Sequence, residues 1–414
     1  MKFVNSLLGL SLLLAASSQA HALSRNAGQT NQSAQQESPD SPRPILLNYT
    51  LLKTIDLATL SQNLASFGIK ARNGVSIYKV SYATESLDDT SLNASGIIII
   101  PDTKAAVFPW VSIQHGTIIA KAEAPSVAPF EGLAEASQGF VAVAADYIGY
   151  GDSAALPHPY IIAKGYQKPL VDLLRAAREL ANQKDFDLGP LFLKGYSEGG
   201  YATLALQKAL ETDYSTEFSI VASAPSAGPY NVELTGVLNV EKPVVNPVNL
   251  PFVVLAYNYW LADGQLALND IFLPAVATVE DALSGAYNSD QVFAILPSTA
   301  SGLFQSAFVA DFTSDQPTLP TSRDLRALLR TQTLLDGWIP KAPTRFYHCI
   351  DDNEIPVAVT EQAVATFKAA GAPSISSVLI PSPTTGQPYL HGNCPAIFSP
   401  LQWFGEILSG KAAQ

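Results

Sequence analysis

Short apolar runs recur through the first half of the chain, and segments with apolar residues at helical spacing lie between them. An alternating run at 75–83 predicts a strand with one buried face, whereas nearly continuous runs predict strands covered on both faces. The continuous runs are 96–101, 110–114, 140–145 and 191–193. Helical spacing predicts helices over 49–67, 163–183 and 201–211. This alternation of strands and helices predicts an α/β protein with a mostly parallel sheet.

The alternation stops between 230 and 340, after a strand at 218–223 that the segment 224–229 breaks. This stretch is rich in Pro, Leu, Tyr and Asn and includes a long apolar run at 250–262. We interpret it as a mostly helical insertion that lies over the active face. The alternation then resumes. Strands are predicted at 344–350 and 376–381, and helices at 357–370 and 395–408.

The first residues have the features of a targeting segment. Lys2 precedes an apolar run at 7–16, and Ala20-His-Ala22 fits the small-x-small cleavage pattern, with cleavage after Ala22 or, alternatively, after Ala20. The pattern predicts a signal peptide at 1–22 and a disordered leader at 23–44, followed by a core at 45–229, a cap insertion at 230–340 and a second part of the core at 341–414. We therefore expect an exported protein, extracellular or periplasmic.

Composition narrows the classes of partner. The 414 residues are 47% hydrophobic and 14% charged, with a formal net charge of -12 and no basic cluster. Nucleic acids and anionic membranes are therefore unfavourable partners. We expect no metal or cofactor, because no cluster of metal-ligating residues is visible. Composition leaves the oligomeric state open.

The candidate chemistry centres on Gly195-x-Ser197-x-Gly199, which stands between a predicted strand and a predicted helix. A turn this tight strains the serine backbone and exposes its hydroxyl, and the glycines remove side chains that would clash. The spacing alone is common, and a glycine-rich loop with a serine helix cap is the alternative. The setting favours a nucleophile elbow at Ser197.

A serine nucleophile needs a base, and the base needs a carboxylate to orient it. In enzymes with such an elbow the order along the chain is serine, acid, histidine. Among the five histidines, three precede Ser197 and His348 lies within a predicted strand, which leaves His391. The acid is expected after the strand at 344–350, where Asp352 is preferred over Asp351 because it stands four residues before Pro356. Both aspartates could instead cap the next helix.

Two backbone N–H groups are expected to hold the oxyanion. One belongs to Glu198, the residue after the serine, and the other to Thr117 in Gln114-His-Gly-Thr117. A plain turn glycine at Gly116 is the alternative. A second Gly-Asp-Ser sequence ends at Ser153, which we interpret as loop structure because no elbow helix follows it.

The chain has two cysteines, Cys349 and Cys394, three residues from Asp352 and His391 respectively. In an exported protein such a pair is expected to form a disulfide, which would tie the acid loop to the histidine loop. The alternative is two small buried apolar side chains.

Four motifs together resemble a known family. They are Gln114-His-Gly-Thr117 with Pro125-Ser126, Asp146-Tyr-x-Gly-Tyr-Gly151, Gly195-Tyr-Ser-x-Gly-Gly200, and Tyr347-His348 leading to Asp352-x-x-Ile-Pro356. The set resembles the α/β-hydrolases, and within them the secretory lipases of the lipase A type and their bacterial secreted esterase relatives. The resemblance covers about 92–408 apart from the insertion. It departs from the family around the acid, where Cys349, Ile350 and Asp351 replace small residues and Asn353 replaces a glutamate.

The resemblance implies a mostly parallel sheet with helices on both faces, a helical cap, and a triad of Ser197, Asp352 and His391. We expect a secreted lipase or esterase that cleaves small-molecule or lipid esters with uncharged, hydrophobic groups. The apolar insertion could also make transient contact with a lipid interface, although a buried cap helix explains the same run. The alternatives are a serine exopeptidase that holds a free amine with Glu280, Asp281 and Asp290, and a silent binding protein on this scaffold.

Overall fold

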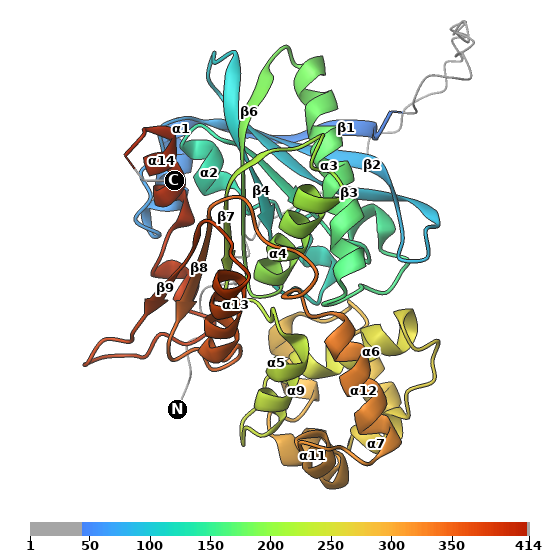
Figure 1. The fold of residues 1–414 in the computed structure, drawn as a ribbon. Helices are drawn as coiled ribbons and strands as arrows, with labels where there is room; N and C mark the ends of the chain where they lie inside the picture. Colours follow the sequence, from blue (N-terminus) through green and yellow to red (C-terminus); the bar gives the residue numbers. More distant parts are fainter. Residues whose placement is uncertain (1–43, 412–414) are drawn as a thin grey trace, which may run out of the picture. The chain divides into compact units, whose positions relative to one another are not determined.

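A nine-stranded sheet runs through residues 44–411, the part of the chain that the computed structural model describes (Figure 1). Its order is β1-β2-β3-β5-β4-β6-β7-β8-β9. The strands are β1 Leu46–Ile55, β2 Val75–Glu85, β3 Ser91–Pro101, β4 Val107–Gln114, β5 Val141–Ala145, β6 Asp187–Tyr196, β7 Ile220–Ser226, β8 Thr344–Cys349 and β9 Ile375–Ile380. The first three strands are antiparallel, β3 is antiparallel to β5, and every pairing from β5 to β9 is parallel. The predicted signal peptide and nearly all of the predicted leader lie outside the described residues.

The apolar strands are buried on both faces, as their composition predicts. In β3, Ile97 and Ile99 pack into one apolar cluster while Ile98 packs into the other. The face with Ile97 and Ile99, here called the first face, is covered by helices α1 Leu57–Ala65, α2 Leu133–Ser137 and α14 Pro400–Leu408. Helices α3 Ala163–Gln183, α4 Glu198–Thr212 and α13 Val357–Ala369 cover the second face. The architecture is an α/β fold with a mostly parallel sheet, as predicted.

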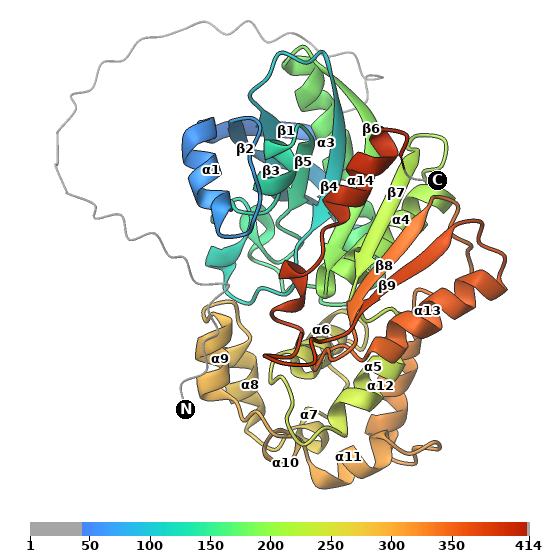
Figure 2. The same cartoon turned by 90° about the vertical axis from the view of Figure 1, so that its left-hand side faces the viewer.

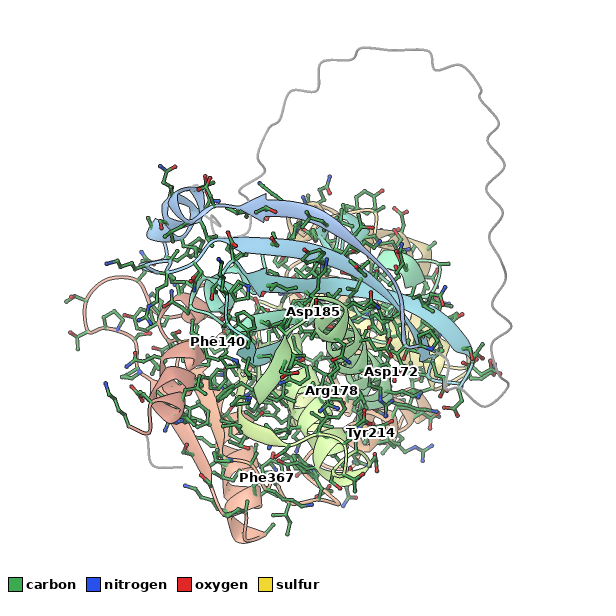
Figure 3. The ribbon with its side chains drawn as sticks, turned by 90° about the horizontal axis from the view of Figure 1, so that it is seen from above. Phe140, Asp172, Arg178, Asp185, Tyr214 and Phe367 are labelled. Carbon is green, nitrogen blue, oxygen red and sulfur yellow. A yellow bond between two sulfur atoms is a disulfide. The ribbon has the colours of Figure 1, made fainter. Side chains whose placement is uncertain are left out.

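Helix α3 spans the residues that its amphipathic pattern predicts, Ala163–Gln183. Its apolar side packs on the sheet, and Asp172 and Arg178 are two of its charged residues (Figure 3). The Arg178 guanidinium lies over the ring of Phe218 at 4.0 Å. The buried carboxylate of Asp172 accepts a hydrogen bond from Arg175 Nη1 at 2.7 Å.

The helix predicted over 49–67 is wrong in its first half. Residues Leu46–Ile55 form strand β1, which pairs antiparallel with β2 so that Tyr49 lies opposite Val80. Helix α1 begins only after Asp56, whose side chain accepts a hydrogen bond from the N–H of Thr59. The helical spacing of leucines was misleading because backbone pairing with β2 overrides local periodicity. The cap at Asp56 was the local signal for the later start.

Two other boundaries differ from the prediction. Strand β7 begins at Ile220 and continues through Pro225 to Ser226, beyond the predicted break. The final predicted helix is split into a 3-10 turn at Cys394–Ala396 and helix α14 at Pro400–Leu408. Pro400 occupies the first turn of α14, where a missing N–H costs no hydrogen bond.

Helices α5 to α12 lie between β7 and β8 in sequence, and Figure 2 shows them gathered at one end of the sheet. They are α5 Val232–Val240, α6 Asn249–Trp260, α7 Leu268–Ile271, α8 Val276–Ala282, α9 Ser289–Ile295, α10 Ala300–Leu303, α11 Ser306–Phe312 and α12 Pro320–Thr331. The insertion meets the core through α6, where the Tyr257 hydroxyl donates to the carbonyl of Ile161 at 2.8 Å. No helix within residues 44–411 is long and apolar enough to cross a membrane.

Candidate active site

Ser197 stands at the junction of β6 and α4 with φ 61° and ψ -124°, a left-handed conformation that is strained for a residue with a side chain. Glycine is required on either side of this turn. A Cβ atom at Gly199 would collide with the carbonyl of Gln114 and lie 2.7 Å from the carbonyl oxygen of His115. A Cβ atom at Gly195 would collide with the carbonyl of Gly199. The two glycines thus allow β6 and α4 to approach each other and β4 closely enough to form the elbow.

The structure brings Ser197, His391 and Asp352 together. Nε2 of His391 lies 2.8 Å from Oγ of Ser197, and Nδ1 lies 2.6 Å from Oδ2 of Asp352. The ionised carboxylate can only accept a hydrogen bond, so Nδ1 carries the hydrogen and Nε2 is left to accept one from the serine hydroxyl. This tautomer is assigned from the hydrogen-bond network. Such an arrangement can remove the serine proton and hold the resulting imidazolium.

Asp352, rather than Asp351, reaches the histidine. Its second oxygen, Oδ1, accepts hydrogen bonds from the N–H groups of Glu354 at 2.9 Å and Ile355 at 2.8 Å. These bonds hold the carboxylate in place while Oδ2 faces His391. Asp351 is exposed to solvent. The geometry therefore favours the first of the two alternatives that the sequence left open.

Burial and charge act in opposite directions on the two ionisable partners. Burial by itself raises the pKa of Asp352. The charge of His391 and the hydrogen bonds from His348 and His391 outweigh burial and hold the pKa of Asp352 below the ordinary range. Burial lowers the pKa of His391, and the nearby carboxylates of Asp352 and Glu354 raise it above its ordinary value. The imidazole is therefore a stronger base than a free histidine.

Thr117 and Glu198, the expected oxyanion donors, lie on neighbouring segments. Gln114 at the end of β4 is paired with Gly195 of β6, and a Cβ atom at Gly116 would lie 3.9 Å from Cβ of Ser197. Glu198 is the first residue of α4, where helical N–H groups have no partner within the helix. Within residues 44–411 neither of these N–H groups has a backbone acceptor. Both remain free to donate to a ligand.

The hydrogen bonds that join Ser197, His391 and Asp352 involve none of the other candidates. The hydroxyl of Ser153 is buried and donates to the carbonyl of Tyr150 at 2.9 Å, which agrees with a structural role. Glu280, Asp281 and Asp290 are solvent-exposed residues of the insertion. Among the described residues there is no group of three or more His, Cys, Asp or Glu side chains that could hold a metal ion.

Similarity to known proteins is found at the level of structure. No protein-family model matches the chain, and no curated protein matches it. The rice cell wall degrading esterase LipA from Xanthomonas oryzae is 26% identical, with a TM-score of 0.77 over 90% of this chain and 100% of that one. A putative hydrolase from Legionella pneumophila has the same fold at 24% identity, with a TM-score of 0.77 over 89% of this chain and 100% of its own. Candida antarctica lipase A shares the fold at 16% identity, with a TM-score of 0.62 and coverage of 90% and 84%.

The chain has the α/β-hydrolase fold that these esterases and lipases share. In this hydrolase the loops that follow β4, β6, β8 and β9 carry Thr117, Ser197, Asp352 and His391. The carboxyl ends of parallel strands meet at one edge of a sheet, which is where such sheets place their ligand sites.

The α/β-hydrolase also contains contacts around the histidine that sequence reasoning missed. The Tyr196 hydroxyl donates to the carbonyl of His391 at 2.8 Å, and burial followed by the charge of Asp352 raises the pKa of this tyrosine, so it stays a donor. The amide oxygen of Asn353 accepts the N–H of His391 at 3.0 Å. Asn353 was one of the departures from the family pattern, and that departure was the only signal for its contact.

The expected disulfide is present and joins Cys349 at the end of β8 to Cys394 beyond the histidine. Both cysteines are fully buried. Asp352 and His391 thus lie on loops that are joined by the disulfide, by the Asn353 contact and by their own hydrogen bond. His348, which the sequence excluded as the base, also lies near Asp352, with its Nε2 at 3.4 Å from Oδ2.

Proposed function

We propose that this α/β-hydrolase is a secreted serine esterase or lipase that cleaves carboxylic esters through an acyl-enzyme on Ser197. The observation that carries the proposal is the 2.8 Å distance between Nε2 of His391 and Oγ of Ser197. This distance lies within the range that proton transfer requires of a nucleophile and its base. The esterase and lipase activities in the names of the structural neighbours point to the same reaction class.

In the proposed reaction, Oγ of Ser197 attacks the ester carbonyl carbon while its proton passes to Nε2 of His391. Asp352 holds the imidazolium through Nδ1, and the N–H groups of Glu198 and Thr117 stabilise the oxyanion of the tetrahedral intermediate. Collapse of the intermediate expels the alcohol, which takes the proton from His391. Water then attacks the acyl-enzyme by the same route, and the carboxylic acid leaves with Ser197 restored.

The substrate class is proposed from the surroundings of the expected oxyanion site. Thr117 lies beside Tyr160, whose ring is stacked on Phe252 of α6 with centroids 4.6 Å apart. Helix α6 comes from the apolar run of the insertion, and seven of its residues are buried: Leu250, Pro251, Phe252, Val253, Val254, Ala256 and Tyr257. An insertion that presents apolar and aromatic groups here favours uncharged, hydrophobic acyl or alcohol groups. We propose that it acts as a cap over the site.

Secretion is part of the proposal and is supported by the targeting pattern at 1–22 and by the Cys349–Cys394 disulfide. Disulfides persist in oxidising compartments and are rare in the cytosol. Expression of the full chain in a bacterial host, followed by N-terminal sequencing of the exported form, tests this point. An N-terminus at Leu23 is expected, whereas an intact Met1 on exported protein would contradict cleavage.

The activity is tested with p-nitrophenyl esters from acetate to palmitate and, in parallel, with aminoacyl p-nitroanilides. Hydrolysis of the esters together with covalent labelling of Ser197 by a fluorophosphonate is the expected result. Faster hydrolysis of the anilides would favour the exopeptidase alternative. Absence of both turnover and labelling would favour a binding protein and would contradict the proposal.

A further inference from the structure

One loop, 157–162, contacts both residues that are proposed to hold the oxyanion. Nε2 of His158 lies 2.8 Å from Oε1 of Glu198, and the Tyr160 hydroxyl lies 2.8 Å from Oγ1 of Thr117. Glu198 directly follows the proposed nucleophile, while Thr117 follows strand β4. The proposed reaction uses only the backbone N–H groups of Glu198 and Thr117, so it does not explain why their side chains have partners on a single loop.

The carboxylate of Glu198 is enclosed by the protein. The residue is 2% exposed, and its Oε1 also accepts a hydrogen bond from the Tyr166 hydroxyl at 3.0 Å. Within residues 44–411 the only ion-pair partner of Glu198 is His158, which is itself 5% exposed. A buried carboxylate that lacked this partner would carry a large desolvation cost.

The hydrogen bonds of His158 determine the charge of the pair. Its Nδ1 lies 2.8 Å from the carbonyl oxygen of Ile148, which can only accept, so Nδ1 carries a hydrogen. The contact between Nε2 and Glu198 then holds one further proton, on the ring or on the carboxyl group. In either case His158 and Glu198 together have no net charge. The helix N-terminus beside Ser197 therefore does not present an uncompensated negative charge to an oxyanion.

The surroundings of the pair are aromatic. The rings of five residues have centroids between 5.0 and 6.0 Å from that of His158, namely Tyr147, Tyr150, Tyr160, Tyr166 and Phe252. Tyrosine rings at this distance supply a dry, low-dielectric environment in which a nearby bare carboxylate would repel a developing oxyanion strongly. None of these side chains is a cation that could replace His158.

We propose that His158 and Tyr160 are positioning residues of the oxyanion hole. His158 holds the first residue of α4 through the Glu198 carboxylate and cancels its charge, and Tyr160 holds Thr117 through its hydroxyl. Both act through the residues that supply the N–H groups and neither touches the substrate. This inference rests on the proposed ester hydrolase function, because it requires an oxyanion to form between Thr117 and Glu198.

The first test uses His158→Asn, which keeps a donor for the Ile148 carbonyl but no longer reaches Glu198. A lost oxyanion donor costs about a hundredfold or more in kcat, so misplacing one should lower kcat by about tenfold to a hundredfold with KM changed by less than about twofold. The inhibition constant of a trifluoromethyl ketone should rise by the same factor, since Ser197 adds to its carbonyl and creates an oxyanion in the same place.

Charge compensation is tested by adding Glu198→Gln to His158→Asn. The amide removes the buried charge at nearly the same size, so the double variant should regain most of the kcat that the single variant loses. A role of His158 in packing alone predicts no recovery. If His158→Asn does not fold, His158→Gln replaces it, because an amide can donate to Glu198 but supplies no proton that cancels the charge of the carboxylate.

The second contact is tested with Tyr160→Phe, for which Tyr257→Phe is the matched control. The control also removes one buried hydroxyl bonded to the same loop, at the carbonyl of Ile161, but that hydroxyl reaches neither donor residue. Both variants should lower the melting temperature similarly. Only Tyr160→Phe should lower kcat and raise the inhibition constant of the trifluoromethyl ketone, each by about fivefold to tenfold.

The outcomes separate this inference from the proposed function. Wild-type protein that hydrolyses esters and is labelled at Ser197, together with variants at 158 and 160 whose kcat is unchanged, would overturn the inference alone. A fall in kcat that Tyr257→Phe shares, or a double variant no better than His158→Asn, would also overturn it. Wild-type protein that neither turns over nor is labelled would overturn both.

Discussion

The side-chain carboxylate of Asp352 lies 2.6 Å from Nδ1 of His391, although the two residues are 39 positions apart in the chain. The acid lies on the loop after β8 and the histidine on the loop after β9, two parallel strands paired from Thr344 to Cys349. A disulfide and the Asn353 side chain also connect these loops. The orientation of the proposed base thus depends on several contacts between two segments rather than on one.

Replacement of the proposed nucleophile should abolish turnover and leave the fold intact. Ser197→Ala is expected to lower kcat by about a millionfold, as removal of a triad serine does in other hydrolases, and to prevent fluorophosphonate labelling. Ser153→Ala is the matched control, because it removes the serine of the other Gly-x-Ser-like segment, Gly151 to Ser153. It should lose some stability and keep its labelling at Ser197. A Ser197→Ala variant that retains one per cent of wild-type activity would refute the assignment.

The two neighbouring aspartates should respond differently to the same change. Asp352→Asn places an amide opposite Nδ1, which favours the wrong imidazole tautomer, and should lower kcat by about ten thousandfold. Asp351 is exposed, and Asp351→Asn should change kcat by less than about twofold. Steady-state kinetics with one p-nitrophenyl ester measures both. Equal losses in the two variants would mean that the carboxylate of Asp352 is not the orienting group.

The pH dependence of kcat/KM should reflect the raised pKa of His391. Burial lowers this pKa, and the carboxylates of Asp352 and Glu354 raise it above the ordinary 6.5. His391 can act as a base only when neutral, so activity should be lost as the pH falls through a value above 6.5. Removal of the charge in Asp352→Asn should move this limb to lower pH in the residual activity. A limb that does not move in the variant would assign it to another group.

The disulfide should stabilise both the fold and the site. In the chain-entropy model, closing a loop with a sequence separation of 45 contributes about 4 kcal/mol to the free energy of unfolding. Cys349→Ala/Cys394→Ala should therefore unfold at lower denaturant concentration and also lose activity, because the loops of Asp352 and His391 are no longer tied. Reductant should have a similar effect on the wild type and none on the double variant. Unchanged activity and melting temperature in the double variant would show that neither the fold nor the site depends on the disulfide.

Local sequence predicted the regular parts of this fold because their signals are local. The apolar side of Ala163–Gln183 repeats at helical spacing, and the structure has a helix over the same residues. The segment 49–67 has a similar spacing but is divided between β1 and α1. Its first half is an edge strand, which among residues 44–411 has β2 as its only strand partner. A pairing between distant backbones leaves little trace in side-chain periodicity.

In the candidate site too, some residues have a local sequence signal and others do not. Glycines two positions either side of Ser197, and the elimination of four of five histidines, directed attention to Ser197 and His391 from the sequence alone. The spacing to Pro356 favoured Asp352, but it did not exclude Asp351, because adjacent residues share their local pattern. The His158–Glu198 pair was missed, since its two residues are 40 positions apart. His158 lies in no motif, and Glu198 occupies the variable position of the elbow motif, which gives its side chain no signal.

The sequence by itself determined the α/β class, the elbow at Ser197 and the residue types available for its chemistry, because turn sterics and apolar periodicity act over a few neighbouring residues. Only the tertiary structure decided which aspartate reaches His391, that the two cysteines meet, and that one loop contacts both Thr117 and Glu198. Those relationships depend on side chains from separate strands meeting at one edge of the sheet, and such distances arise only when the whole sheet is assembled.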